Sequence, residues 1–88
     1  MVFDYRGKII QVKDRYIEAY ERFNGYKFDN DEIDTYIYNE YIWDRKRENE
    51  IPQIVDKLSV SKIERIIEKY LVLIMRVYTG NLHYEDIR

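Results

Sequence analysis

The segment SKIERIIEKYLVLIMRVY, residues 61–78, decides the fold class of this chain of 88 residues. Ser61 and Glu64 form the S-x-x-E pattern of a capping box, and strongly apolar residues follow it. The pattern predicts a helix over residues 62–78. From Leu71 onward, apolar residues cover nearly the whole circumference of this helix. A helix that is apolar all round is buried on all sides. Few helices of so short a chain can be buried in this way, so we expect a homo-oligomer.

An earlier helix is indicated over residues 8–24, where apolar residues recur at the spacing of one helix face. Gly25 follows in the position of a left-handed helix terminator. The pattern therefore predicts one long helix. The alternative is a hairpin, in which VFDY and KIIQV flank the turn Arg6-Gly7, and Asp14 caps a shorter helix. The β-branched residues of KIIQV keep this alternative open.

Two more helices lie between these segments. In DNDE, Asp29 or Asn30 offers a capping oxygen and carboxylates fill the first turn. We expect this helix to end near Arg47, because the cations of RKR suit the negative end of the helix dipole. NEIPQIVDKLS then predicts a short helix with Pro52 in its first turn. At the end of the chain, Gly80 is expected to terminate the last helix.

These elements predict a single domain of residues 1–88, all-α in class. It is a small, mainly helical bundle of three long and one or two short helices, with the N-terminal β-hairpin as an alternative start. A content of 45% hydrophobic and 36% charged residues is typical of such a folded domain. The chain has no Cys, which excludes disulfides and thiol nucleophiles. No segment reads as a signal peptide or a membrane span, so we expect a cytoplasmic protein, in the host cytoplasm if it is viral.

The stretch TYIYNEYIWDRKR, residues 35–47, carries four aromatic residues followed by three cations. One half of its apolar residues forms a core-facing stripe. Tyr38 and Ile42 project from the opposite side and need a second partner, which is another helix of the domain, a second subunit or a foreign protein. Interfaces favour Tyr, whose ring is apolar and whose tip is polar. We therefore predict a protein interface that consists of Tyr38, Ile42, Arg45 and Lys46.

The middle of the chain is acidic, since residues 26–44 carry a net charge of −5 and the flanking segments carry +1 and +2. A clustered acidic surface can orient a partner. We therefore predict an acidic patch that consists of Asp29, Asp31, Glu32 and Asp34. The competing interpretation is that these carboxylates cap a helix.

The same segment partly matches a calcium-binding loop. Asp29, Asp31 and Glu40 have the spacing of three ligands in such a loop. Ile33 and Asp34 break the pattern at its centre, where a ligand and a glycine are required. We therefore expect no metal site.

In IVDKLSVSKIERII, residues 54–67, a second interaction motif is indicated. Ile54, Leu58, Val60 and Ser61 fall in register with a helix-turn-helix, and Ser59 stands in the usual glycine position. The segment thus resembles the helix-turn-helix of DNA-binding proteins, from which it departs at Val55 and Arg65. The resemblance implies a DNA-binding regulator that uses residues 51–78. A stripe of cations suited to phosphates supports it, namely Lys62, Arg65, Lys69 and Arg76.

No catalytic constellation is apparent in the sequence. His83 is the only histidine, and Glu64 and Glu68 have the spacing of ordinary salt-bridge formers. Phosphate-binding loops, zinc signatures and nucleophile elbows are missing. We therefore expect no enzyme, no cofactor and no small-molecule substrate. A compact, Tyr-rich, acidic domain suits a small regulator or inhibitor of the kind carried by viruses and mobile elements, which binds a host protein or self-associates.

Overall fold

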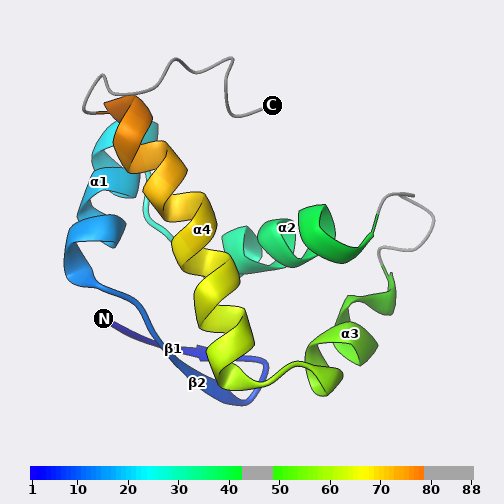
Figure 1. Ribbon diagram of the computed structural model, residues 1–88. Helices are drawn as coiled ribbons and strands as arrows, with labels where there is room; N and C mark the ends of the chain where they lie inside the picture. The colour runs from blue at the N-terminus through cyan, green and yellow to red at the C-terminus, as the bar shows by residue number, and fades with distance from the viewer. Residues whose placement is uncertain (43–48, 79–88) are drawn as a thin grey trace.

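Six elements form the described part of the molecule, and one long helix runs through its middle (Figure 1). The computed structural model describes residues 1–42 and 49–78. In chain order the elements are β1 (Val2–Tyr5), β2 (Lys8–Gln11), α1 (Asp14–Asn24), α2 (Asn30–Tyr41), α3 (Ile51–Lys57) and α4 (Val60–Tyr78). α4 packs against α1, α2 and β2, and α3 packs on α2. The expected mainly helical fold is confirmed, and its N-terminal start is the hairpin that was the alternative.

The N-terminal segment is a hairpin, so the prediction of one helix over residues 8–24 was wrong and the alternative was right. The paired residues are Val2 with Gln11, Phe3 with Ile10, Asp4 with Ile9 and Tyr5 with Lys8. The turn between the strands has positive φ at both of its residues, 49° at Arg6 and 82° at Gly7. A two-residue turn of this kind matches the twist of the strands. β-Branched residues pack well on a pleated strand, which favours this outcome over a helix.

Helix α1 therefore begins only at Asp14, with Lys13 as its N-cap. The expected cap by Asp14 was wrong, because Asp14 lies in the first turn and the N-cap residue Lys13 makes no side-chain capping hydrogen bond. The Asp14 carboxylate lies 2.7 Å from the N-terminal ammonium of Met1. The predicted terminator is confirmed, because Gly25 has a φ of 79° and its N–H donates to the carbonyl of Glu21 at 2.8 Å.

Helix α2 begins as predicted and ends earlier than predicted. The Asp29 carboxylate accepts hydrogen bonds from the backbone N–H groups of Asp31 and Glu32, at 3.1 and 3.3 Å. The helix ends at Tyr41 and not near Arg47, because Ile42 adopts an extended backbone. The extended backbone turns the Ile42 side chain into the core, where it is 2% exposed.

The connection between α3 and α4 corrects the predicted capping box. The hydroxyl of Ser59 accepts the backbone N–H of Lys62 at 3.1 Å, so Ser59 and not Ser61 caps α4. The Glu64 carboxylate reaches across to β2, where it accepts the backbone N–H of Gln11 at 2.8 Å. In residues 1–42 and 49–78, no helix is long and apolar enough to cross a membrane.

Aromatic rings join the helices in the core. Tyr36 of α2 stacks on Tyr70 of α4, with ring centroids 4.7 Å apart and an interplanar angle of 9°. Phe28 meets Tyr20 of α1 edge to face at 5.2 Å and Phe3 of the hairpin at 5.3 Å. Such ring pairs add to the apolar area that is buried. The aromatic residues of this Tyr-rich chain thus hold α1, α2, α4 and the hairpin together.

Candidate interaction surface

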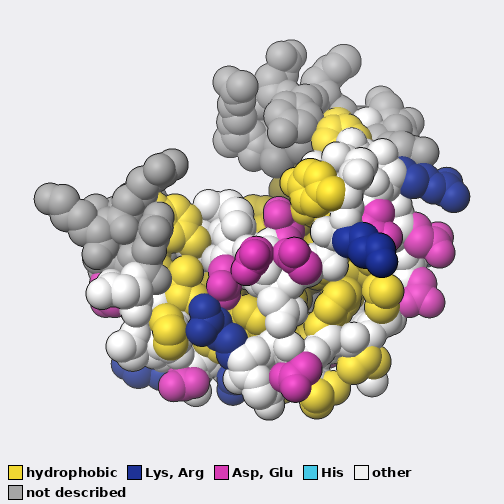
Figure 2. Space-filling view, turned by 180° about the vertical axis from the view of Figure 1, so that it is seen from behind, with side chains coloured by type: hydrophobic (Ala, Val, Ile, Leu, Met, Phe, Trp, Pro, Cys, Tyr) yellow, Lys and Arg dark blue, Asp and Glu magenta, His cyan; other side chains and the backbone are white. Residues whose placement is uncertain are grey.

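Two of the four predicted acidic residues at the start of α2 are engaged within the molecule. Asp29 caps its own helix, as described above. The Asp34 carboxylate accepts the Tyr5 hydroxyl at 2.6 Å and two N–H groups of the Arg6 guanidinium, both at 3.1 Å. These bonds tie the hairpin to α2. Figure 2 shows acidic side chains gathered across the middle of one face of the molecule. Asp29 and Asp34, two of the four residues of the predicted acidic patch, have structural roles.

Glu32 of the same patch is half-buried beside two deeply buried phenols. Burial raises the pKa of Tyr20 and of Tyr36, and the nearby Glu32 carboxylate raises both further. Within the described residues, neither phenol oxygen has a hydrogen-bond partner. Of the four predicted residues, Asp31 and Asp29 are exposed, and Asp29 is already used as a cap.

The predicted aromatic interface is not an exposed surface. Ile42 belongs to the core, so the prediction that it projects away from the core was wrong. Tyr38 is half-buried against the same core, and α3 packs on the helix that carries it. Of the three partners considered for this face, the structure supports a helix of the same domain. Arg45 and Lys46 lie outside the described residues.

The predicted basic stripe lies on the exposed side of α4. Lys62, Arg65, Lys69 and Arg76 are all exposed. Lys69 is already paired, because its ammonium lies 2.6 Å from the Glu40 carboxylate of α2. The hydroxyl of Tyr70 also donates to Glu40, at 2.9 Å. The hydrogen bond from Lys69, aided by that from Tyr70, lowers the pKa of Glu40.

The elements of the helix-turn-helix resemblance occur in the expected order, with α3, the residues Leu58 and Ser59, and then α4. Val55, which departs from the motif, is fully buried, and Arg65 is exposed. The main packing partner of α3 is α2, whereas α4 packs on α1. The local order of elements therefore matches the resemblance, and its DNA-binding role stays a prediction.

Asp29, the first residue of the calcium-loop pattern, caps α2. Among the residues that the structure describes, no group of three His, Asp or Glu side chains could hold a metal ion. His83 and Gly80 lie outside the described residues.

The most exposed apolar side chains lie on the outer face of the hairpin. Val2 and Ile9 alternate with the core-facing residues of their strands and are 59% and 57% exposed. Met1, next to Val2, is 58% exposed. Tyr26, in the loop after α1, is the other large apolar side chain of comparable exposure in the described part of the chain. The hairpin thus offers a small apolar face to solvent.

On each edge of this two-stranded sheet, one backbone group is hydrogen-bonded by a helix side chain. The N–H of Gln11 on the β2 edge is taken by Glu64 of α4, at 2.8 Å. The carbonyl of Asp4 on the β1 edge accepts the side-chain amide of Asn30 at 2.8 Å. These two bonds fasten the hairpin to α4 and α2.

Two clefts border Met1. One, of about 510 Å³, lies between the hairpin, the start of α1 and α4, and its lining includes Lys13, Glu64 and Glu68. The other, of about 530 Å³, lies along α1 and is lined by Met1, Asp14, Ile17, Glu18 and Glu21. We call the exposed side chains of Met1, Val2 and Ile9, together with these two clefts, the hairpin surface.

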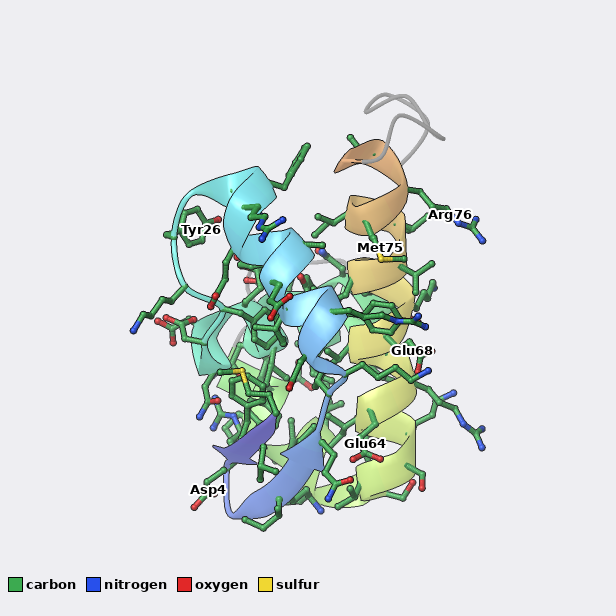
Figure 3. The ribbon with its side chains drawn as sticks, turned by 90° about the vertical axis from the view of Figure 1, so that its left-hand side faces the viewer. Asp4, Tyr26, Glu64, Glu68, Met75 and Arg76 are labelled. Atoms are coloured by element: carbon green, nitrogen blue, oxygen red, sulfur yellow. The ribbon has the colours of Figure 1, made fainter. Side chains whose placement is uncertain are left out.

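Carboxylates dominate the charge of the hairpin surface. Figure 3 shows Glu64 and Glu68 on successive turns of α4. Both residues line the cleft beside the hairpin and the start of α1. Sequence reasoning missed this surface, because it treated Glu64 and Glu68 as ordinary salt-bridge formers. A signal was present in α1, where Asp14, Glu18 and Glu21 have the spacing of one helix face. Nothing in the sequence, however, placed these residues beside Met1.

No protein-family model matches the chain, and no curated protein or solved structure matches it significantly.

Proposed function

We propose that this protein is a non-enzymatic protein-binding module, a small regulator or inhibitor that recognises its partner through the hairpin surface. The observation that carries the proposal is the exposure of Val2 and Ile9, which are diagonal neighbours on the outer face of the hairpin, together with the exposed Met1 that precedes Val2 and lines both clefts. Contiguous exposed apolar side chains rimmed by polar ones are typical of protein interaction sites. The two adjoining clefts add concave shape to this small apolar face.

The lining of the clefts suits binding more than reaction. Its side chains are apolar, carboxylate or amide, with Lys13 and Tyr16 as the remaining polar groups. A nucleophile with an adjacent base, the usual signature of covalent catalysis, does not occur among these lining residues. The analogy to viral and mobile-element regulators rests on size and composition.

A selection from a random peptide library displayed on phage tests the proposal without knowledge of the partner. We expect the wild-type protein to enrich a family of related peptides. The variant Val2→Thr/Ile9→Thr should lose these peptides, because Thr keeps the β-branched shape and removes apolar surface. Tyr26→Gln, which removes the exposed apolar side chain remote from the hairpin, is the matched control and should retain them. Absence of enrichment, or equal loss in both variants, would overturn the proposal.

DNA binding through α4 is the second candidate. It is favoured by the exposure of Lys62 and Arg65 on the first turns of α4, after a short helix and turn. The pairing of Lys69 with Glu40 weakens it, since a paired cation is less available to phosphate. Fluorescence anisotropy with random-sequence duplex DNA at several salt concentrations tests this function. Binding that falls steeply with salt and is weakened in Lys62→Ala/Arg65→Ala would support it, and no binding at low salt would exclude it.

A further inference from the structure

The hairpin surface is unevenly charged. Its two clefts bring together five carboxylates, from Asp14, Glu18, Glu21, Glu64 and Glu68. Two cations oppose them, the Lys13 ammonium and the N-terminal ammonium of Met1. The surface therefore attracts positive charge and repels phosphate.

Three of these carboxylates are already engaged. Asp14 pairs with the N-terminal ammonium at 2.7 Å, Glu64 accepts the Gln11 N–H at 2.8 Å, and Glu21 accepts the Phe28 N–H at 3.1 Å. Within the described residues, the two others, Glu18 and Glu68, form no ion pair and are exposed. One lies in each cleft, on either side of Met1.

We infer that the partner of the hairpin surface is a protein segment that is amphipathic and basic. Its apolar side chains pack on Met1, Val2 and Ile9, and its Lys or Arg side chains reach Glu18 and Glu68. This inference rests on the proposed protein-binding function and adds the chemistry of the partner. A segment that docks with its side chains, as an amphipathic helix does, can contact the apolar side chains and the carboxylates together.

A second copy of the chain fits less well than a separate basic segment. The cations that a second copy presents on α4 include Lys69, which is paired with Glu40. The half-buried side chains that follow Leu71 on α4 are apolar, but they lie beside this stripe and not within an acidic surface. Nucleic acid and anionic membranes are disfavoured by the sign of the charge.

The test uses a fluorescein-labelled peptide of 18 residues, built from Lys and Leu in the pattern of an amphipathic helix. Anisotropy titrations compare the wild-type protein with Glu18→Gln/Glu68→Gln. We expect the neutralised variant to bind roughly fivefold to tenfold more weakly at low salt, with the difference shrinking at high salt, as exposed ion pairs do. Val2→Thr/Ile9→Thr should weaken binding at both salt concentrations.

A charge-matched variant, Asp31→Asn/Asp56→Asn, distinguishes binding at the hairpin surface from a general effect of the net charge of the protein. Both of its residues are exposed and line neither cleft. We expect its affinity to stay within about twofold of wild type. Equal weakening by the two double variants would overturn the inference, because net charge alone would then explain the binding.

Three further outcomes would also overturn it. They are the absence of binding to the Lys/Leu peptide, equal binding to a matched Glu/Leu peptide, and self-association of the free protein in sedimentation that the Glu18→Gln/Glu68→Gln variant abolishes. The library selection distinguishes these outcomes from failure of the proposed function. Enriched peptides that are neutral or acidic would keep the protein-binding function and refute the basic partner, whereas no enrichment would refute both.

Discussion

The carboxylates at the start of α2 and those of the hairpin surface differ in what they bind. The Asp29 carboxylate accepts the hydrogen bonds that cap α2, and the Asp34 carboxylate accepts hydrogen bonds from Tyr5 and Arg6. Glu18 and Glu68 remain exposed beside the clefts at Met1. Each group contains both engaged and exposed carboxylates, since Asp31 in the first group is also exposed. The density of acidic residues along a chain does not identify an acidic binding surface, because nearby donors decide which carboxylates stay free.

The sharpest test of this difference is removal of the most engaged carboxylate. Asp34→Ala leaves the Tyr5 hydroxyl and the Arg6 guanidinium without their acceptor. We expect a loss of about 2 kcal/mol in the free energy of unfolding, the scale of hydrogen bonds to charged groups. In a domain of this size the melting temperature should fall by roughly 10 °C. Thermal and urea unfolding followed by circular dichroism measure both quantities.

Glu68→Gln is the control for this prediction. Its carboxylate is exposed, and its loss should change the free energy of unfolding by less than about 0.5 kcal/mol. If Glu68→Gln were as destabilising as Asp34→Ala, engaged and exposed carboxylates would not differ in their contribution to stability.

A smaller effect is expected at the helix cap. Asp29→Ala removes the acceptor for the N–H groups of Asp31 and Glu32. We expect a destabilisation of about 1 kcal/mol, typical of a lost N-cap. Asp29→Ser, which keeps a capping oxygen, should recover most of the stability in the same urea titration. If Ser and Ala are equally destabilising, the cap does not account for the role of Asp29.

Among the engaged carboxylates, the smallest effect is expected at Glu40, which is half-buried and pairs with the exposed Lys69. The hydrogen bond from Lys69 lowers the pKa of Glu40, and so does the one from Tyr70. A carboxylate with a lowered pKa stabilises the folded state above its unfolded pKa of about 4.3, and the contribution is lost as the pH falls through the folded pKa. Glu40→Gln should therefore cost less than about 1 kcal/mol at pH 7.

Urea titrations of wild type and Glu40→Gln at several pH values check this dependence. The stability difference between the two proteins should shrink as the pH is lowered below about 4. A difference that is constant with pH would mean that the Glu40 charge contributes nothing, and that shape alone explains the effect of the substitution.

Much of the fold could be predicted from local patterns. The Asp29 cap, the Gly25 terminator and Pro52 in the first turn of α3 all lie where the sequence placed them. The errors arose where two local signals competed. Residues 8–12 carry both a helical spacing and β-branched side chains, and pairing with β1 favoured the strand. Ser59 and Ser61 both offer capping oxygens, and α4 starts after the first of them.

The candidate site was harder to predict than the fold. Ile42 was expected on an exposed helix face, but an extended backbone at the end of α2 buries it. Glu64 was expected to complete a capping box, but it caps the edge of β2. At both residues a contact with a distant part of the chain replaced the expected local contact. Local sequence patterns do not show which distant residues will meet.

The sequence by itself determined the helical class, the capping residues and the spacing of the carboxylates along α1 and α4, because these depend on neighbours within one or two turns. Only the tertiary structure decided which carboxylates are used internally and which face solvent. Asp34 meets Tyr5, and Glu64 meets Gln11, across long separations in the chain. Such pairs form only when packing of α1, α2 and the hairpin around α4 brings their side chains together.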